Sequence, residues 1–176
     1  MYLELDRLSK QFDGKYAVHE LSLGLEKGGL LCILGSSGCG KTTTLNMIGG
    51  FLSPDSGRVL LDGQDITALP PERRPVSTVF QSYGLFPHMS VLQNVTYGLI
   101  VEPKLCLLDE PLSNLDAALR VRMRGELKRI QRELGTTMVF VTHDQEEALI
   151  LADSIAVMSE GELLQLGTAE EVFRHP

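Results

Sequence analysis

The feature that most restricts the fold is a glycine-rich loop that follows a short apolar run. Residues 30–34 are apolar throughout, which is typical of a strand buried on both faces of a sheet. They lead into Gly35–Thr42 (GSSGCGKT), which matches G-x-x-x-x-G-K-[ST] at every fixed position, and a helical pattern covers 42–48. Such a loop aims backbone N–H groups at phosphate oxygens, and the helix adds its positive dipole end. The motif predicts a nucleoside triphosphate site; an ordinary glycine-rich turn is the alternative.

Within this loop the residue types suit different parts of a nucleotide. The Lys41 ammonium can reach the β- and γ-phosphates, and the Thr42 hydroxyl can coordinate Mg²⁺. We therefore expect ATP and Mg²⁺ as ligands. The nucleotide-binding residues predicted here are Gly35, Ser36, Ser37, Gly38, Cys39, Gly40, Lys41, Thr42 and Thr43.

Apolar runs and helical patterns alternate along the rest of the chain. Strand patterns occupy 3–8, 18–25, 30–34, 58–61, 76–80, 105–108 and 136–141, and a hairpin pattern joins 154–159 to 163–166. Helical patterns cover 42–48, 91–99, 117–134 and the residues from 145 to 152. This order predicts an α/β fold: a P-loop NTPase core with a mostly parallel sheet, plus an N-terminal antiparallel β subdomain. The whole chain, 1–176, is expected to form one domain.

Polar residues follow three of these strands. Asp109 ends the apolar run 105–108, where a phosphate loop needs a carboxylate that holds Mg²⁺ through water. Glu110 comes next and is placed to orient or deprotonate an attacking water. Gln81 and His143 follow the strands 76–80 and 136–141, at the edge where ligands bind in open parallel sheets. Taken alone, a histidine after a strand, such as His143, is more often structural, and Gln81 also fits a solvated loop amide.

Composition excludes several classes of function. The formal net charge is −7, which argues against a nucleic-acid binder that relies on a basic surface. The three cysteines, Cys32, Cys39 and Cys106, have no C-x-x-C spacing and indicate a reducing compartment. The apolar runs are far shorter than the roughly 20 residues of a membrane helix, and no basic-then-apolar leader opens the chain.

The motifs occur in one order: Phe12, Gly35–Thr42, Gln81, Asp109-Glu110, Ser113–Asp116 and His143. In this order they resemble the nucleotide-binding subunit of ATP-binding cassette (ABC) transporters, and the resemblance extends through nearly the whole chain. It implies that Phe12 stacks on adenine, with Tyr16 as the alternative, and it adds Val18 to the nucleotide-binding residues.

The resemblance also implies a role for each polar residue. Thr42, Gln81 and Asp109 would organise Mg²⁺, and the catalytic residues would be Lys41, Gln81, Glu110 and His143. Here Glu110 positions the water and His143 contacts the γ-phosphate. The segment formed by Ser113, Asn114, Leu115 and Asp116 corresponds to the D-loop, which meets a second ATP-binding subunit in the family's dimers.

The stretch 78–89 (TVFQSYGLFPHM) looks like the importer branch of this family, most of all its polyamine-type members. In that branch the region after Gln81 receives a helix of an integral membrane permease subunit. Tyr83–Met89, with the apolar side chains of Tyr83, Leu85 and Phe86, would be that contact surface. The resemblance thus implies a cytoplasmic subunit, peripheral on the inner face of the membrane, that binds no nucleic acid.

One part of the family pattern is missing. Members of the family insert a helical subdomain, with a Leu-Ser-Gly-Gly-Gln signature, between Gln81 and the strand that ends at Asp109; here only 28 positions separate these residues. The pattern is intact to about Leu99 and resumes at about Val101. The block could be present in the natural protein but absent from this sequence, deleted by design, or lost in a degenerate paralogue; the intact motifs favour the first two. Members of this branch often continue into a small β-rich C-terminal regulatory domain, and we expect none within residues 1–176.

These observations predict an ATP-binding subunit whose ATP hydrolysis energises import by an ABC transporter. Without the signature loop the chain should be a poor ATPase, because the partner's signature loop supplies N–H donors to the γ-phosphate in this family. The alternatives are a nucleotide-binding fragment without efficient turnover and a non-transport ABC ATPase, as in DNA repair. A P-loop kinase is more distant.

Overall fold

The computed structural model describes residues 1–80 and 103–174. Its elements, in chain order, are β1 (Leu3–Phe12), β2 (Lys15–Leu25), β3 (Leu30–Leu34), α1 (Lys41–Gly49), β4 (Ser56–Leu61), β5 (Gln64–Asp65), the 3-10 turn η1 (Pro71–Arg73), β6 (Val76–Val79), β7 (Leu105–Asp109), α3 (Ala117–Leu134), β8 (Thr137–Thr142), α4 (Gln145–Leu151), β9 (Ser154–Ser159), β10 (Glu162–Gly167) and α5 (Ala169–Arg174).

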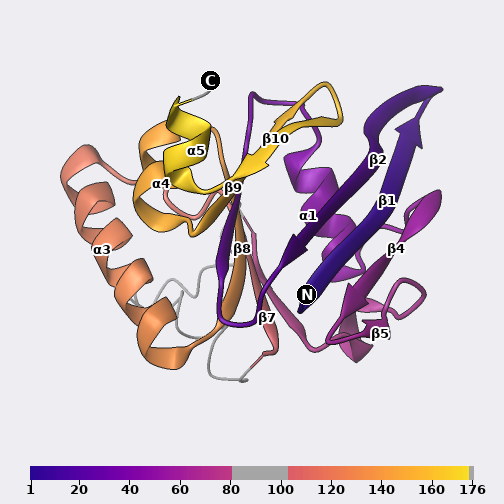
Figure 1. Cartoon of the computed structure of the whole chain (residues 1–176), viewed down its shortest axis with the longest axis horizontal. Coiled ribbons are helices and arrows are strands. Elements are labelled where there is room, and N and C mark those ends of the chain that lie inside the picture. Colours follow the sequence, from indigo (N-terminus) through magenta and orange to yellow (C-terminus); the bar gives the residue numbers. More distant parts are fainter. Residues whose placement is uncertain (81–102, 175–176) are drawn as a thin grey trace.

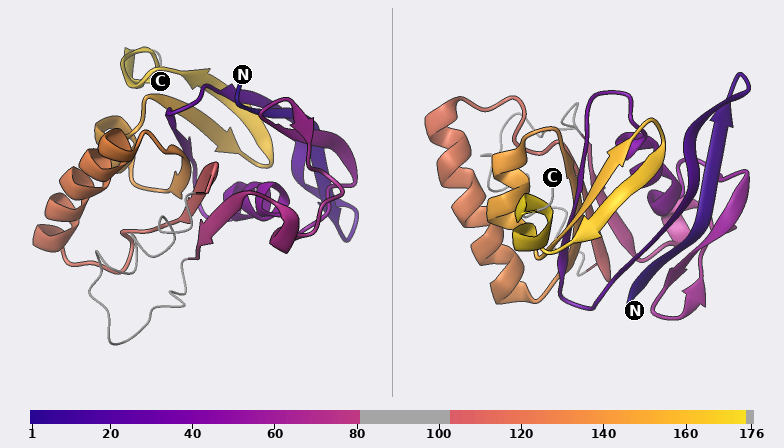
Figure 2. Two further views of the ribbon diagram at one scale, coloured as in Figure 1. Left: turned by 90° about the horizontal axis from the view of Figure 1, so that it is seen from below. Right: turned by 45° about the horizontal axis from the view of Figure 1, so that its top comes forward.

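The larger sheet has the strand order β10-β9-β3-β8-β7-β6, and every neighbouring pair is parallel except β9 with β10. The smaller sheet, β2-β1-β4-β5, is antiparallel throughout. Helices α3, α4 and α5 cover one face of the parallel sheet, while α1 lies between its other face and the antiparallel sheet (Figure 1). The views in Figure 2 show the same layers from two other sides. The predicted fold class is confirmed.

The central strands supply two cores, because successive side chains of a strand point to opposite faces. In β8, Val139 and Val141 face α1 and the antiparallel sheet, whereas Met138 and Phe140 face α3 and α4. β3 and β7 divide in the same way, and the side chains of Leu30, Leu105 and Leu107 are fully buried. Burial on both faces explains why these strands have continuous apolar sequences.

The sequence patterns located most elements correctly. Helix α3 has the predicted bounds, Met123, Leu127 and Ile130 form its buried stripe, and Gly135 ends it in the left-handed conformation. The short elements β5 and α5 were missed, although Thr168 and Glu171 carry the sequence signal of a capping box and exchange hydrogen bonds at the start of α5. The helix expected over 91–99 lies outside the described residues.

Among the helices of 1–80 and 103–174, none combines the length and the apolar character that crossing a membrane requires.

A buried arginine joins the phosphate-loop helix to the segment that leads into β6. The Arg74 guanidinium donates to the carbonyls of Met47 and Ile48 in the last turn of α1, each at 2.8 Å. It also donates to the carbonyls of Thr67 and Leu69, again at 2.8 Å. The last turn of a helix leaves its C=O groups without intrahelical partners, and the Met47 carbonyl accepts, besides Arg74, a long bond from the Gly50 N–H at 3.4 Å. Arg74 therefore fixes the far end of α1.

We predict that Arg74→Met lowers the free energy of unfolding by about 3 kcal/mol, because it leaves carbonyls unpaired in a buried place. The measurement is urea unfolding followed by circular dichroism. Arg73→Met, one residue earlier and exposed, is the matched control and should change stability little. Equal unfolding midpoints for the two variants would contradict this role of Arg74.

Candidate functional site

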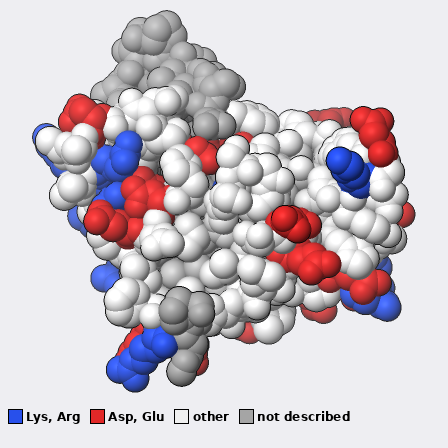
Figure 3. Space-filling view, turned by 90° about the horizontal axis from the view of Figure 1, so that it is seen from above, with Lys and Arg blue, Asp and Glu red and all other residues white. Residues whose placement is uncertain are grey.

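The predicted site residues gather at the carboxyl edge of the parallel sheet. β3 ends at Leu34, the loop 35–40 follows, and α1 runs back from that edge between the two sheets (Figure 1). β7 ends at Asp109 and β8 at Thr142, so Glu110 and His143 follow their strands at the same edge. Figure 3 looks onto this edge from above; there the acidic and basic side chains of the described residues are interspersed among uncharged ones.

Lys41 is the first residue of α1, and its side chain turns back over the loop. Its ammonium donates to the carbonyls of Gly35 and Ser36, each at 2.8 Å, and lies 3.9 Å from the Cys39 sulfur. The side chain is buried, with 5% of its surface exposed. Lys41 thus holds a positive charge at the centre of the loop, beside the unbonded N–H groups of the first turn of α1.

The loop is supported from behind by β2 and by the turn between β9 and β10. A Cβ on Gly40, whose φ is 105°, would lie 2.3 Å from the carbonyl oxygen of Ala17. Gly161 donates to the Cys39 carbonyl and accepts a bond from the N–H of His19. The side chains of Val18 and Cys39 are buried on this side, so they support the loop, and their contact with a nucleotide stays a prediction.

Asp109 and Thr42 meet on the floor of the site. The Thr42 hydroxyl donates to the Asp109 carboxylate at 3.1 Å, which joins the start of α1 to the end of β7. The pKa of Asp109 is raised above its ordinary value, mainly by burial and further by the neighbouring Glu110 carboxylate. The Thr42 hydrogen bond and the Lys41 charge lower this pKa but do not outweigh the burial. A nearby cation would favour the charged carboxylate.

Two oxygens of this kind fit Mg²⁺, which is commonly held by one or two protein oxygens, several waters and substrate phosphates. No cluster of three or more His, Cys, Asp or Glu side chains suited to a metal occurs within 1–80 and 103–174. The donor set therefore suits a cation that arrives with a phosphate ligand rather than one held by protein alone.

Glu110 and His143 face each other across the mouth of the site. The Glu110 carboxylate lies 3.3 Å from His143 Nδ1, and His143 is the more exposed of the two side chains. Glu110 has a φ of 46°, a left-handed conformation that costs energy in a residue with a side chain. Its backbone is held there, because its N–H donates to the Val141 carbonyl and its carbonyl accepts from Ser113.

These groups line one pocket with a volume of about 550 Å³. Its lining residues are Ser36, Ser37, Gly38, Gly40, Lys41, Thr42, Thr43, Glu110 and His143. The structure thus brings together the phosphate loop and two of the residues predicted to act on the γ-phosphate. Gln81 lies outside the described residues, as do Tyr83–Met89.

The two aromatic candidates for adenine binding are exposed but do not line this pocket. Phe12 ends β1 with about half of its surface exposed, and the Lys10 ammonium lies 5.8 Å from the centre of its ring. Tyr16 is equally exposed and packs against His19, with ring centres 4.2 Å apart. Their role stays a prediction.

The segment Ser113–Asp116 forms the connection between β7 and α3. Asp116 caps α3, since its carboxylate accepts the N–H of Leu119 at 2.9 Å. Ser113 closes a turn onto Glu110, with its N–H and hydroxyl both directed at the Glu110 carbonyl. The predicted contact of this segment with a second subunit stays a prediction.

Sequence reasoning missed a charged cluster between α3 and α4. Arg120 and Arg124 of α3 face Asp144, Glu146 and Glu147, and Arg124 and Glu147 are buried. Asp144 caps α4, and Glu147 is the third residue of that helix, a spacing typical of a helix start. The i, i+4 spacing of the two arginines, beside the apolar stripe of α3, was the available signal.

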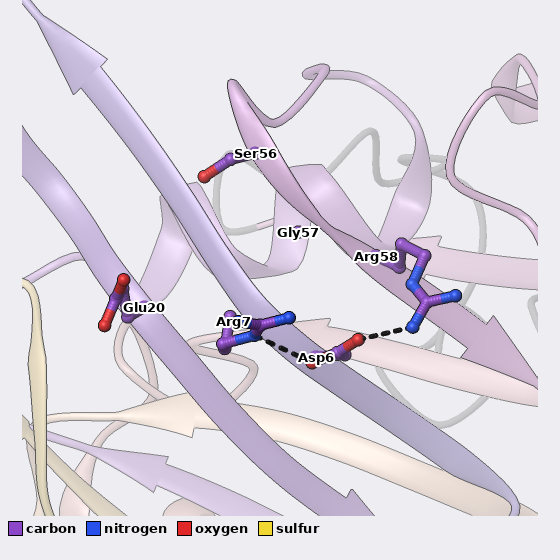
Figure 4. Close-up of a pocket in the computed structure, with 6 residues that line it drawn as sticks. All are labelled: Asp6, Arg7, Glu20, Ser56, Gly57 and Arg58. Carbon is purple, nitrogen blue, oxygen red and sulfur yellow. Dashed lines mark hydrogen bonds and ion pairs between the residues drawn. The ribbon is translucent and has the colours of Figure 1, made fainter.

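A second pocket, of about 460 Å³, lies on the antiparallel sheet and is lined by Asp6, Arg7, Glu20, Ser56, Gly57 and Arg58. Figure 4 shows that Asp6 lies between the two arginine side chains, and its carboxylate pairs with both of them. Because these charges neutralise one another on an exposed surface, the pocket offers no group aimed at a ligand.

The fold and the loop geometry define a domain of the P-loop α/β class. A model of the family described as "ABC transporter" matches residues 18–176. The chain therefore belongs to the ABC transporter family. Two similar relatives are the spermidine/putrescine import ATP-binding protein PotA of Marinobacter nauticus and the Fe(3+) ions import ATP-binding protein FbpC of Agrobacterium fabrum.

The chain is 45% identical to this PotA over 222 aligned residues, which cover 99% of the chain and 60% of PotA. It is 42% identical to the FbpC over 219 residues, covering 97% of the chain and 62% of FbpC. The chain therefore spans about 60% of the length of the curated relatives it matches.

Solved structures agree with the fold. CbiO1 of Clostridium perfringens, described as part of the ABC transporter complex cbiONQ, superposes with a TM-score of 0.83 at 25% identity, covering 99% of this chain and 91% of that one. An ATP-binding cassette in its ADP conformation gives a TM-score of 0.87 at 20% identity, covering 99% and 95% of the two chains.

We predict that Gly40→Ala destabilises the protein by about 3 kcal/mol, since alanine is strained at this φ and its Cβ would overlap the Ala17 carbonyl. Thermal unfolding measures the effect. Gly14→Ala is the matched control: Gly14 also has a positive φ, 78°, but open space around it, so a cost of only about 1 kcal/mol is expected. If both variants lower the stability by the same amount, the contact between the loop and β2 does not contribute to the stability of the protein.

Proposed function

We propose that this chain is the nucleotide-binding part of an ABC importer's ATP-binding subunit, and that it binds ATP with Mg²⁺. The observation that carries the proposal is the pocket in which Lys41, the first turn of α1, Glu110 and His143 converge. Lys41 and the loop amides would hold the phosphates, while Thr42 and Asp109 would hold the cation. Both groups of relatives are import proteins, but their cargoes differ, so the proposal extends to import and not to a cargo.

In hydrolysis, Glu110 would orient the attacking water and accept its proton, and His143 would contact the γ-phosphate. The distance of 3.3 Å between the two side chains supports this division, because a proton acceptor and a phosphate contact must lie on the same side of the reacting group. Gln81, from its place in the sequence, would complete the cation site. Phe12 would stack on the adenine.

A permease contact at the end of β6 is part of the proposal. Phe80, the last described residue before Tyr83–Met89, is 39% exposed and meets the 52% exposed Phe51 edge to face, with ring centres 5.1 Å apart. An exposed aromatic pair next to the predicted contact segment favours an apolar partner surface there. A second ATP-binding subunit is proposed to contact Ser113–Asp116, as the family resemblance implies.

We further propose that the helical block is missing between about 99 and 101. The alignment with the PotA relative covers 222 positions, whereas this chain has 176 residues, so at least 46 positions of that relative have no counterpart here. This number suits a subdomain of several helices. It favours a second candidate function, nucleotide binding without efficient turnover, because the signature loop would lie in that block.

Lys41→Ala is expected to weaken ATP binding by about ten- to a hundredfold, the worth of a charge-assisted hydrogen bond. Titration of the 176-residue chain with a fluorescent ATP analogue in the presence of Mg²⁺ measures this. Lys27→Ala is the control, since Lys27 is exposed and precedes β3 at the opposite end of the strand. Tight binding by Lys41→Ala would overturn the role of the loop.

Glu110→Gln is expected to lower any ATP turnover of the chain at least about a hundredfold while ATP binding is retained, because an amide cannot accept the proton of water. Phosphate release and binding are measured on the same preparation. Turnover unchanged in Glu110→Gln would contradict the assignment of Glu110.

A further inference from the structure

Arg120 of α3 makes polar contacts with two segments that border the site. Its guanidinium donates to the carbonyls of Ser113 and Leu115, at 3.4 and 3.2 Å. The same group lies 3.6 Å from the carboxylate of Asp144 and 3.8 Å from that of Glu147. Arg120 thus bridges the segment Ser113–Asp116 and the start of α4.

Both segments lead directly to the pocket. On one side, the Ser113 N–H and hydroxyl hold the Glu110 carbonyl. On the other, the buried Glu147 carboxylate accepts the Thr142 hydroxyl at 2.7 Å, and this hydroxyl oxygen accepts the N–H of Asp144 at 3.0 Å. His143 lies between these two bonded residues, so its backbone is held by the same contacts.

The contacts therefore close a ring. It runs from Glu110 through Ser113 to Arg120, from Arg120 to Glu147 and Thr142, and back to Glu110 through the His143 side chain. Within the described residues, Arg120 and Glu147 are the charged members of this ring that do not line the pocket.

We propose that Arg120 is a positioning residue. It fixes the segment Ser113–Asp116 relative to the segment Thr142–Glu147, and so it fixes His143 relative to Glu110. The inference rests on the proposed function, because it assigns His143 to the γ-phosphate. The proposal also concerns assembly, because a second chain that contacts Ser113–Asp116 would alter the position of His143 through the Arg120 side chain.

Arginine suits this place because a planar guanidinium offers several donors in fixed directions, which one ammonium cannot do. Two of its nitrogens serve the two segments, while Nε is buried and has no hydrogen-bond partner within the described residues. The nearby Glu147 carboxylate is 3.8 Å away, so a small movement of α4 toward α3 would shorten that pair.

Arg124 lets the proposal be tested without losing the fold. It is buried and lies 3.1 Å from the carboxylates of both Asp144 and Glu146, so it keeps α4 attached to α3 when Arg120 is replaced. The side chain of Arg120 is itself 30% exposed, and blue and red side chains are intermixed on the α3 and α4 side of the molecule, left in Figure 3. Arg120→Met is therefore expected to fold.

The experiment measures His143 by NMR in the 176-residue chain with ¹³C-labelled histidine. The chain has four histidines, and the His143 signal is assigned by its loss in His143→Gln. Spectra are taken with Mg·ADP and with the Mg complex of a non-hydrolysable ATP analogue; the shift between the two reports contact with the γ-phosphate. Affinities for both nucleotides are measured on the same samples.

For Arg120→Met we expect an ADP affinity within about twofold of the unaltered chain, a roughly three- to tenfold weaker affinity for the ATP analogue, and loss of at least about half of the His143 shift difference. Arg122→Met removes an exposed arginine from the same helix and should behave like the unaltered chain. An unchanged affinity ratio and shift difference in Arg120→Met overturn the proposal.

Glu147→Gln provides a second route if Arg120→Met does not fold. Its amide oxygen can still accept the Thr142 hydroxyl, while the ion pairs with Arg120 and Arg124, at 3.8 and 3.9 Å, are lost, so the same selective loss of ATP-analogue affinity is expected. The double variant should lose no more than the worse single variant, and additive losses would contradict coupling through this pair. If the unaltered chain binds neither nucleotide, the proposed function itself fails. If the unaltered chain binds both and the two variants show the same affinities and the same His143 shift difference as the unaltered chain, only the positioning role fails.

Discussion

The candidate site depends on the parallel pairing of β3, β8 and β7, which brings the ends of three strands to one level. Leu34 of β3 pairs with Thr142 of β8, and Val141 of β8 pairs with Asp109 of β7. The loop after β3, the carboxylate of β7 and the histidine after β8 therefore meet at one edge. A shift of one residue in this register would move each of these groups by about 3.3 Å and turn its side chain to the other face.

The sequence predicted this framework well, for a physical reason. Strands buried on both faces have nearly continuous apolar sequences, so 30–34, 105–108 and the apolar part of 136–141 were recognisable from the sequence alone. The residues that follow such strands lie at the ligand-binding edge of a parallel sheet, which predicted that Asp109, Glu110 and His143 lie at one edge. The phosphate loop was equally readable, because glycines and one lysine at fixed spacing determine a backbone shape.

What the sequence did not predict are contacts that depend on the approach of separate elements. Arg74 reads as one more charge in a proline-bracketed loop, yet it is buried against the end of α1. Glu147 reads as a surface acid of a helix start, yet its carboxylate is buried beneath Thr142. Arginine can be buried wherever its donors meet several oxygens, and such a meeting follows from helix packing rather than from local spacing. The adenine contact predicted for Phe12 stays a prediction, because contact of its ring with a ligand depends on where the end of the β1–β2 hairpin lies.

The loop around Lys41 and the pair formed by Glu110 and His143 are held in place by different kinds of contact. Lys41 has backbone carbonyls for partners within its own loop, and the loop is supported from behind by Ala17 of β2 and by Gly161. Glu110 and His143 are instead held by long-range contacts through Ser113, Val141 and the cluster around Glu147. The hydrogen-bond partners of the Lys41 ammonium are thus local in sequence, whereas those that hold Glu110 and His143 come from distant elements. The placement of Glu110 relative to His143 therefore depends on how α3 and α4 pack against the sheet.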